Sequence, residues 1–456
     1  MAYDVIRAVS VDQAYANLVL PRLLRERRVD GRDAAFATEL AYGTLRSLGP
    51  LDAIITEVAG RGLDAIDRPV LDLLRLGAYQ LLRTRVPTHA AVASTVDLSR
   101  SAGSPRASGF VNAVLRRIAA RTWDEWTERL AEGGDARDAL ALRHAHPRWI
   151  VDAIAEALGG DLTETAAALA ADDARPQTHL VAWPGRIAAP ELAEQAGGRA
   201  APDDGIRSPY AVRLAAGGDP GQLTAVRGGR AGVQDEGSQL CAAALAAAPL
   251  TGPDAAWADL CAGPGGKTAL LGALAAERGA TVLANELHPH RARLIEDVLR
   301  RAGGGWPVQV AVGDARAVRA PAGTAGFDRI LLDAPCTGLG ALRRRPEARW
   351  RRRPGDLADL VAVQTDLLRA ALALARPGGL VAYVTCSPHP AETTGVLDAV
   401  LGRPGSGTSA PGELVDARAL FAAGGDPAEL GPGPWVQLWP HRHGADAMFF
   451  ALLRRP

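Results

Sequence analysis

The sequence predicts a multidomain protein in which a small all-helical bundle is followed by a small α/β connector and then by a doubly wound α/β domain. Three observations support this prediction. The chain has 456 residues, which is too long for one core. Its first part has apolar residues at helical spacing, and its last part alternates strand-like and helix-like segments. We place the domains at residues 1–142, 143–232 and 233–456.

The N-terminal region has apolar residues three and four positions apart and lacks the alternation that is typical of strands. These residues are Ala14, Leu18, Leu23, Leu24, Ala37, Leu40, Ala41, Leu45, Val70, Leu71, Leu74 and Tyr79. Pro69, Pro87 and Pro105 divide the region into short helices, because proline cannot occupy a helix interior without cost. The region therefore predicts an all-helical bundle. Its many arginines fit a solvated face as well as an RNA-binding one.

The remainder of the chain contains predicted strands. Residues 143–232 hold a helix at 149–158 and a strand at 177–183. From residue 233 onward, five apolar segments are predicted as buried parallel strands, at 255–261, 281–286, 308–313, 327–333 and 380–385. Helical segments lie between them. Two last strands, at 435–439 and 447–453, are separated by a short turn and are expected to pair antiparallel.

Charge and cysteine content limit the classes of function. The 51 basic and 51 acidic residues balance, so any surface for a polyanion must be local. The four cysteines lack the spacing of a zinc site and the density of a disulfide scaffold. No signal core or membrane-crossing run is apparent. We therefore expect a soluble protein of the reducing cytoplasm, without a metal or a membrane partner.

Two cysteines stand where predicted strands end. Cys336 closes the run Asp333-Ala334-Pro335-Cys336, and Cys386 lies in Thr385-Cys386-Ser387. In open α/β sheets, ligands bind beyond the carboxyl ends of the strands, so both thiols are expected at one crevice. Either thiol alone is equally well explained as a small buried hydrophobe.

The other strand ends carry glycine or acid. Glycines at 263, 265 and 266 follow the first strand and permit a tight turn at the start of a helix. Glu286 ends the second strand and is placed to accept ribose hydroxyls, while Asp314 follows the third and is placed to meet an adenine amino group. A single acid of this kind often caps a helix. Together they predict a nucleoside-binding site made of Cys261, Ala262, Gly263, Pro264, Gly265, Gly266, Lys267, Glu286, Asp314 and Asp333.

Lys267 is the only lysine of the chain. Because arginine and lysine are not interchangeable, a lysine retained in an arginine-rich protein suggests a site too tight for a guanidinium group. Chance retention of one lysine is the alternative.

These motifs resemble a known family. The segments 259–268, 333–340, 343–347 and 385–387 resemble the RNA cytosine-5 methyltransferases of the Nop/Sun family, and 233–239 resembles the segment before the cofactor motif there. The segments 36–46, 74–80 and 110–116 are similar to the NusB-like RNA-binding domain of the bacterial Sun (RsmB, Fmu) branch. The predicted parallel sheet with a final antiparallel hairpin is the form of Rossmann-like methyltransferases.

The resemblance implies an S-adenosyl-L-methionine-dependent enzyme that acts on RNA, and specifically on a cytosine of the 16S RNA of the small ribosomal subunit. It implies that Cys386 attacks carbon 6 of the base and that Cys336 assists product release, with Lys267 and Asp333 in supporting catalytic roles. Residue chemistry alone leaves the order of the two thiols open, because DNA cytosine-5 methyltransferases attack with the cysteine of a Pro-Cys pair. A monomer is the default expectation.

Three further points concern the site. The arginines at 343–345 and 349–353 are expected to contact phosphates beside the flipped base, unless they form a solvated helix. Glu392 is followed by Thr393, where the family often has asparagine. An amino-group methyltransferase and a non-catalytic RNA-binding protein remain alternatives; the first typically carries Asp/Asn-Pro-Pro-aromatic in place of Asp333-Ala334-Pro335-Cys336.

Overall fold

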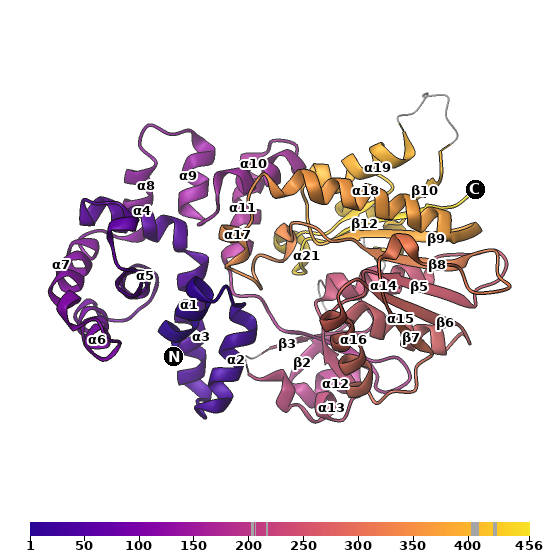
Figure 1. Cartoon of the computed structure of the whole chain (residues 1–456), viewed down its shortest axis with the longest axis horizontal. Coiled ribbons are helices and arrows are strands. Elements are labelled where there is room, and N and C mark those ends of the chain that lie inside the picture. The colour runs from indigo at the N-terminus through magenta and orange to yellow at the C-terminus, as the bar shows by residue number, and fades with distance from the viewer. Residues whose placement is uncertain (202–204, 206, 216–217, 403–409, 423–425) are drawn as a thin grey trace. The chain divides into compact units, whose positions relative to one another are not determined.

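The computed structural model of the chain describes residues 1–201, 205, 207–215, 218–402, 410–422 and 426–456. They form two compact units, whose elements are labelled in Figure 1. One unit comprises residues 1–175 and 342–353, and the other comprises residues 176–341 and 354–456. This division describes which segments pack together. The domain limits at 142 and 232 remain predictions.

The first unit is entirely helical in its described residues, as the apolar spacing predicts (Figure 1). Its helices are α1 (Ala2–Val11), α2 (Ala16–Glu26), α3 (Gly31–Arg46), α4 (Leu48–Ala59), α5 (Arg68–Arg83), α6 (Thr88–Ser101), α7 (Ser108–Ile118), α8 (Trp123–Leu130), α9 (Ala136–Arg143), α10 (Arg148–Ala157), α11 (Leu162–Asp173) and α17 (Ala348–Arg351), with 3-10 turns η1 (Leu63–Ala65) and η2 (Pro105–Ala107). Helix α5 shows the pattern clearly. Pro69 stands in its first turn, where no backbone donor is needed, and Val70, Leu71, Leu74 and Tyr79 are buried.

One apolar residue of the helical pattern does not face the core. Leu18 is 67% exposed, whereas Ala16, Val19 and Leu20 form the buried face of α2. At about 100° per residue, position 18 lies roughly opposite position 16 on the helix. The three-and-four spacing therefore predicts the helix correctly but does not place Leu18 on its buried face.

The segment 342–353 follows the Cys336 motif in sequence but packs within the helical unit. The Nε1–H of Trp350 donates to the backbone oxygen of Arg46 (3.1 Å). The buried carboxylate of Glu347 accepts the backbone N–H of Ala16 (3.3 Å). The chain thus leaves the second unit directly after Ala341, contributes α17 to the first, and returns at Pro354.

The expectation that all arginines of this segment contact phosphate is wrong for Arg349. Its side chain is fully buried and donates to the backbone oxygens of Ala145 (3.0 Å) and Asp172 (3.2 Å). Burial lowers the pKa of this guanidinium to about 10, with smaller effects from neighbouring charges. Arg349 therefore stabilises the helical unit and has no access to a ligand.

The second unit begins with a four-stranded antiparallel sheet of order β2-β3-β1-β4. Its elements are β1 (His179–Ala182), α12 (Ala189–Ala196), β2 (Gly198–Ala200), β3 (Ala211–Leu214), η3 (Pro220–Gln222), α13 (Thr224–Arg227) and β4 (Ala231–Val233). The strand predicted at 177–183 corresponds to β1.

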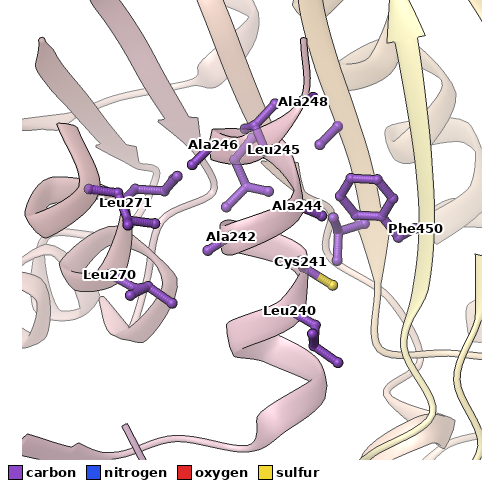
Figure 2. Close-up of a cluster of buried hydrophobic side chains, with 14 of the residues drawn as sticks. Leu240, Cys241, Ala242, Ala244, Leu245, Ala246, Ala248, Leu270, Leu271 and Phe450 are labelled. Carbon is purple, nitrogen blue, oxygen red and sulfur yellow. The ribbon is translucent and has the colours of Figure 1, made fainter. Parts of the chain in front are cut away.

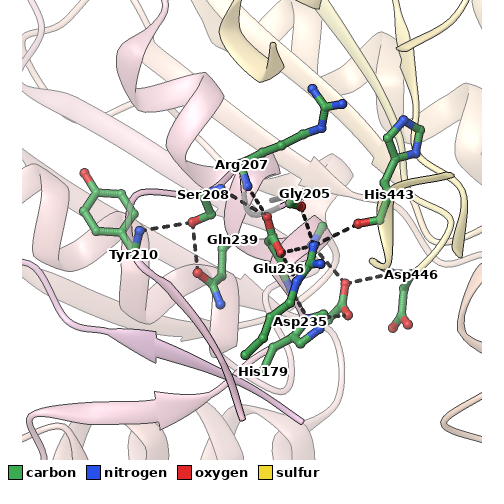
Figure 3. Close-up of polar contacts among 12 residues, drawn as sticks. His179, Gly205, Arg207, Ser208, Tyr210, Asp235, Glu236, Gln239, His443 and Asp446 are labelled. Atoms are coloured by element: carbon green, nitrogen blue, oxygen red, sulfur yellow. Dashed lines mark hydrogen bonds and ion pairs between the residues drawn. The ribbon is translucent and has the colours of Figure 1, made fainter. Parts of the chain in front are cut away.

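The segment 233–239 joins this small sheet to helix α14 (Glu236–Ala247) through a buried polar network (Figure 3). The carboxylate of Glu236 accepts the backbone N–H groups of Arg207 (2.6 Å) and Ser208 (3.1 Å) and pairs with the guanidinium of Arg213 (2.7 Å). Because a buried charge is costly unless it is paired and hydrogen-bonded, this motif has a structural role.

The larger sheet has the order β10-β12-β9-β8-β5-β6-β7, with β11 paired to β12. Strands β5 to β9 pair parallel, whereas β12 runs antiparallel to β9, β10 and β11. The elements are β5 (Ala256–Leu260), α15 (Gly266–Ala276), β6 (Thr281–Glu286), α16 (Pro289–Arg301), β7 (Val308–Val312), η4 (Ala315–Ala317), β8 (Phe327–Asp333), η5 (Leu339–Ala341), α18 (Asp356–Leu374), β9 (Ala375–Thr385), η6 (Pro390–Glu392), α19 (Thr394–Leu401), β10 (Glu413–Val415), α20 (Arg418–Phe421), η7 (Pro427–Leu430), β11 (Val436–Gln437), α21 (Pro440–His443) and β12 (Phe449–Arg454). The predicted parallel sheet with an antiparallel end is confirmed, and β10 was missed.

Helices cover both faces of this sheet (Figure 1). Along β9, Ala382 and Val384 pack with residues of α14 and α15, while Val381 and Tyr383 pack with residues of α18 and α19. Figure 2 shows the α14 cluster, in which Cys241 is fully buried. None of the helices in the described ranges combines the length and apolar character needed to cross a membrane.

We predict that Arg349→Ala lowers the free energy of unfolding of the helical unit by about 3 kcal/mol, because two buried carbonyls lose their donors and a cavity forms. Chemical denaturation followed by circular dichroism of the helical signal measures the change. Arg345→Ala is the matched control, since Arg345 is exposed. Equal losses in the two variants would contradict the structural role of Arg349.

Candidate active site

The two cysteines at the strand ends meet. The Sγ atoms of Cys336 and Cys386 are 3.3 Å apart and are not joined by a disulfide. The strands that lead to them, β8 and β9, are neighbours in the sheet, with Asp333 opposite Val384. After each of these two strands the backbone leaves the sheet at the same edge. This brings together two thiols that are 50 positions apart in the sequence.

A close backbone approach fixes the loop that carries Cys336. The N–H of Gly340 donates to the backbone oxygen of Cys386 (2.8 Å), and the oxygen of Gly340 accepts the N–H of Ala447 (2.8 Å). A Cβ atom at position 340 would lie 1.9 Å from the oxygen of Ala447, so only glycine fits there. The Cys336 loop is therefore held against the Cys386 loop by backbone contacts.

Lys267 and Asp333 form an ion pair beside the thiols. Their Nζ and Oδ2 atoms are 2.9 Å apart, and the lysine side chain is only 11% exposed. Burial alone would lower the pKa of Lys267, but the charge of Asp333, assisted by Cys241 and Cys386, outweighs burial and raises it. Lys267 is thus a permanent cation at neutral pH, and the structure brings together the four residues predicted as catalytic.

The glycine turn after β5 is hydrogen-bonded to Glu286 at the end of β6. Glu286 is buried, and its Oε2 accepts the N–H of Gly263 (3.0 Å). A Cβ at position 263 would lie 2.5 Å from the same oxygen. Arg291 donates to the carbonyl of Gly263 (2.5 Å) and lies 3.6 Å from Glu286. Sequence reasoning missed Arg291, which lies on α16 among solvated charges.

The junction of β5 and α15 is held by a buried acid. Asp259, at the end of β5, accepts the hydroxyl of Thr268 (2.6 Å). Burial raises the pKa of Asp259 to about 7. Between Asp259 and Thr268, Cys261 adopts a positive φ of 63° and Gly265 a positive φ of 103°. These two residues turn the chain into helix α15. Ala262, Pro264 and Gly266 lie in this turn, at the carboxyl edge of the sheet.

Asp314 follows β7 at the same edge, but its carboxylate already has partners. It accepts the backbone N–H of Arg316 (2.9 Å), capping η4, and pairs with the guanidinium of the same residue (2.6 Å). The predicted contact with an adenine amino group remains a prediction.

The Cys336 thiol is held in its protonated form. Its hydrogen bond with Cys386, then burial, then the charges of Cys386, Glu392 and Asp333 raise its pKa well above the usual range. Burial likewise raises the pKa of Cys241 and of Cys261 to about 12. Cys336 is therefore a neutral thiol at neutral pH in the free protein.

Four further residues surround the thiols and were not predicted. They are Thr337, Gln364, Ser387 and Glu392, which form a buried hydrogen-bonded network. Thr337 and Ser387 directly follow the two cysteines and lie within the motif segments 333–340 and 385–387, which is the signal that the sequence offers for them. Gln364 lies within a long helix, and its position gives no such signal.

Comparison with known proteins gives the family. Residues 248–454 match the family model described as "16S rRNA methyltransferase RsmB/F", and residues 1–120 match the NusB family. The chain is 54% identical to "Putative methyltransferase Rv1407" of Mycobacterium tuberculosis, covering 100% of this chain and 95% of that protein. The chain belongs to the RsmB/F methyltransferase family. Its C-terminal domain is therefore a methyltransferase domain, and the resemblance drawn from the motifs is confirmed.

Two further similarities extend over nearly the whole chain. "Ribosomal RNA small subunit methyltransferase B" of Erwinia tasmaniensis is 32% identical, over 99% of this chain and 97% of that protein. The solved structure of PH0851 has a TM-score of 0.79 at 23% identity and covers 99% of this chain and 97% of its own. The similarity to the PH0851 structure shows the fold alone. The two family matches show that this chain combines a helical NusB domain with a methyltransferase domain.

We predict that hydrogen peroxide joins Cys336 and Cys386 in a disulfide, because their sulfur atoms need to approach by only about 1.3 Å to reach a bond length of about 2.05 Å. Two thiols lose two hydrogen atoms, and one peroxide is reduced to two waters. Peptide mass spectrometry should detect the cross-linked pair, and dithiothreitol should reverse it. Sulfinic acid at either cysteine without a cross-link would contradict the prediction.

Proposed function

We propose that the protein is an S-adenosyl-L-methionine-dependent RNA cytosine-5 methyltransferase that acts on 16S ribosomal RNA through a covalent cysteine–RNA intermediate. The observation that carries this proposal is the thiol pair, with its sulfur atoms 3.3 Å apart beside the Lys267–Asp333 ion pair. Methylation of an amino group needs no thiol. Methylation of a ring carbon needs a nucleophile that first activates the ring.

The residues at the strand ends fit S-adenosylmethionine. Glu286 is held by Gly263, so the glycine turn and the carboxylate are fixed relative to each other, as recognition of a ribose next to a backbone turn requires. The bound cofactor would supply an electrophilic methyl group. Ten residues are proposed to hold it: the seven from Cys261 to Lys267, and Glu286, Asp314 and Asp333.

The chain's own residues then have separate tasks. Asp333 is placed to accept a hydrogen bond from the exocyclic amine of the base. Cys386 adds to carbon 6, which makes carbon 5 nucleophilic. After methylation, a general base removes the proton from carbon 5 of the cytosine. The Cys386–carbon 6 bond then breaks to release the product. Cys336 assists this release. The ammonium of Lys267 stabilises negative charge that develops in the crevice.

Ribosomal RNA is proposed as the substrate for two reasons. The Erwinia relative is named as a methyltransferase of ribosomal RNA, and the N-terminal residues of this chain match the NusB family. A target base must leave its stack to reach this crevice, which a single-stranded or looped segment of RNA allows at low cost.

We predict that Cys386→Ala abolishes transfer of labelled methyl groups to 16S RNA, by at least about a thousandfold. Cys336→Ala should instead accumulate a covalent RNA–protein adduct, because addition proceeds but release fails. Denaturing gel electrophoresis resolves the adduct. Cys241→Ala, which removes a buried core thiol, serves as the control and should keep turnover.

Methylation by Cys386→Ala would rule out Cys386 as the nucleophile. An adduct in Cys386→Ala and none in Cys336→Ala would reverse the two roles. Methyl transfer that survives in both variants would favour an amino-group methyltransferase.

A further inference from the structure

Glu392 is a buried carboxylate close to the thiols. It ends the short turn η6 after Cys386, and none of its side chain is exposed. A carboxylate taken out of water is costly unless donors surround it. Thr337 donates to it twice, from its backbone N–H (2.7 Å) and from its hydroxyl, and the Nε2–H of Gln364 donates once (3.0 Å).

These donors belong to the loop that carries Cys336 and to the helix behind it. Thr337 directly follows Cys336. Gln364, on α18, also donates to the backbone oxygen of Pro335 (2.8 Å), and Pro335 directly precedes Cys336. The chain is therefore held on both sides of Cys336 by contacts that converge on Glu392.

The same carboxylate is tied to the Cys386 side. The hydroxyl of Tyr383, on the strand that leads to Cys386, donates to the backbone oxygen of Glu392 (2.7 Å). The hydroxyls of Thr337 and Ser387 are 3.1 Å apart, and Ser387 directly follows Cys386. One buried network thus fixes the residues next to both thiols.

The charges around the two thiols differ. The hydrogen bond with Cys386, burial and the charge of Cys386 raise the pKa of Cys336 most, and the charges of Glu392 and Asp333 raise it further. Lys267, in contrast, interacts favourably with negative charge on Cys386. If the only need were to join two loops, a neutral amide would do so without the desolvation cost of a charge.

We propose that Glu392 is a positioning residue that fixes Cys336 against Cys386 and keeps the shared proton on Cys336. The inference rests on the proposed function, because it assigns a use to the two thiols. It adds a physical reason for their order of action: the negative charge near Cys336 leaves Cys386 as the thiol that becomes the nucleophile.

Glu392→Gln tests the proposal, since glutamine has nearly the same shape and lacks the charge. The pH profile of Cys336 alkylation by iodoacetamide, resolved by peptide mass spectrometry, should shift down by about one pH unit. The kcat for methyl transfer should fall about tenfold or more, with KM for RNA and for S-adenosylmethionine unchanged.

Asp328→Asn is the matched control. Asp328 is also a buried carboxylate that accepts backbone N–H groups, from Ala255 and Ala256 (both 2.8 Å), and it differs from Glu392 in pairing with Arg376 (2.6 Å). It lies five positions before Asp333 on β8, about 16 Å along the strand. This variant should leave the Cys336 profile in place.

Thr337→Val separates position from charge and provides a second variant. It removes the hydroxyl between the loops but leaves the Glu392 charge, so kcat should fall without a downward shift of the Cys336 profile.

An unshifted Cys336 profile in Glu392→Gln, or a shift of the same size in Asp328→Asn, would overturn the proposal. A shifted profile with unaltered kcat would also overturn it. Because alkylation needs neither RNA nor cofactor, its outcome decides the role of Glu392 even if the protein proves to have no activity on RNA.

Discussion

The approach of Cys336 to Cys386 is the constraint on which the site depends. Two parallel strands, β8 and β9, end side by side, and each continues into a loop that bears one thiol. The loops touch through Gly340, where a side chain has no room, and through the network centred on Glu392. Hydrogen bonds in such a dry interior act strongly and leave little freedom, so the sulfur atoms are held in place before any substrate arrives.

Some buried charges are held in ion pairs, and others are held by neutral groups alone. Lys267 faces Asp333, Arg213 faces Glu236, and Glu392 is surrounded by neutral donors. The first arrangement places a cation and an anion beside the two thiols, whereas the second joins the small antiparallel sheet to the larger domain. Glu392 differs from both because its charge has no cationic partner among the contacts described. That difference is why we assign it an effect on Cys336 beyond packing.

Much of the fold follows from local sequence pattern. The strands at 281–286 and 327–333 were predicted with their observed bounds, because each holds a short run of consecutive apolar residues and ends in an acid. The short strand β10 has three residues and no comparable signal. Arg349 could not be predicted as buried, since its partners Ala145 and Asp172 lie about two hundred positions away in sequence. The two thiols could be predicted to lie together because strand ends meet at one edge, whereas the roles of Lys267 and Asp333 came from the family resemblance and remain predictions. No role was predicted for Glu392, because an acid in a loop is usually solvated.

The central claim is that the thiol pair serves chemistry at a ring carbon of cytosine. Nucleoside mass spectrometry of 16S RNA, after incubation with the intact protein and isotope-labelled S-adenosylmethionine, tests it most directly. The account predicts label in 5-methylcytidine. Label confined to a nucleoside methylated on nitrogen or on the ribose would contradict it.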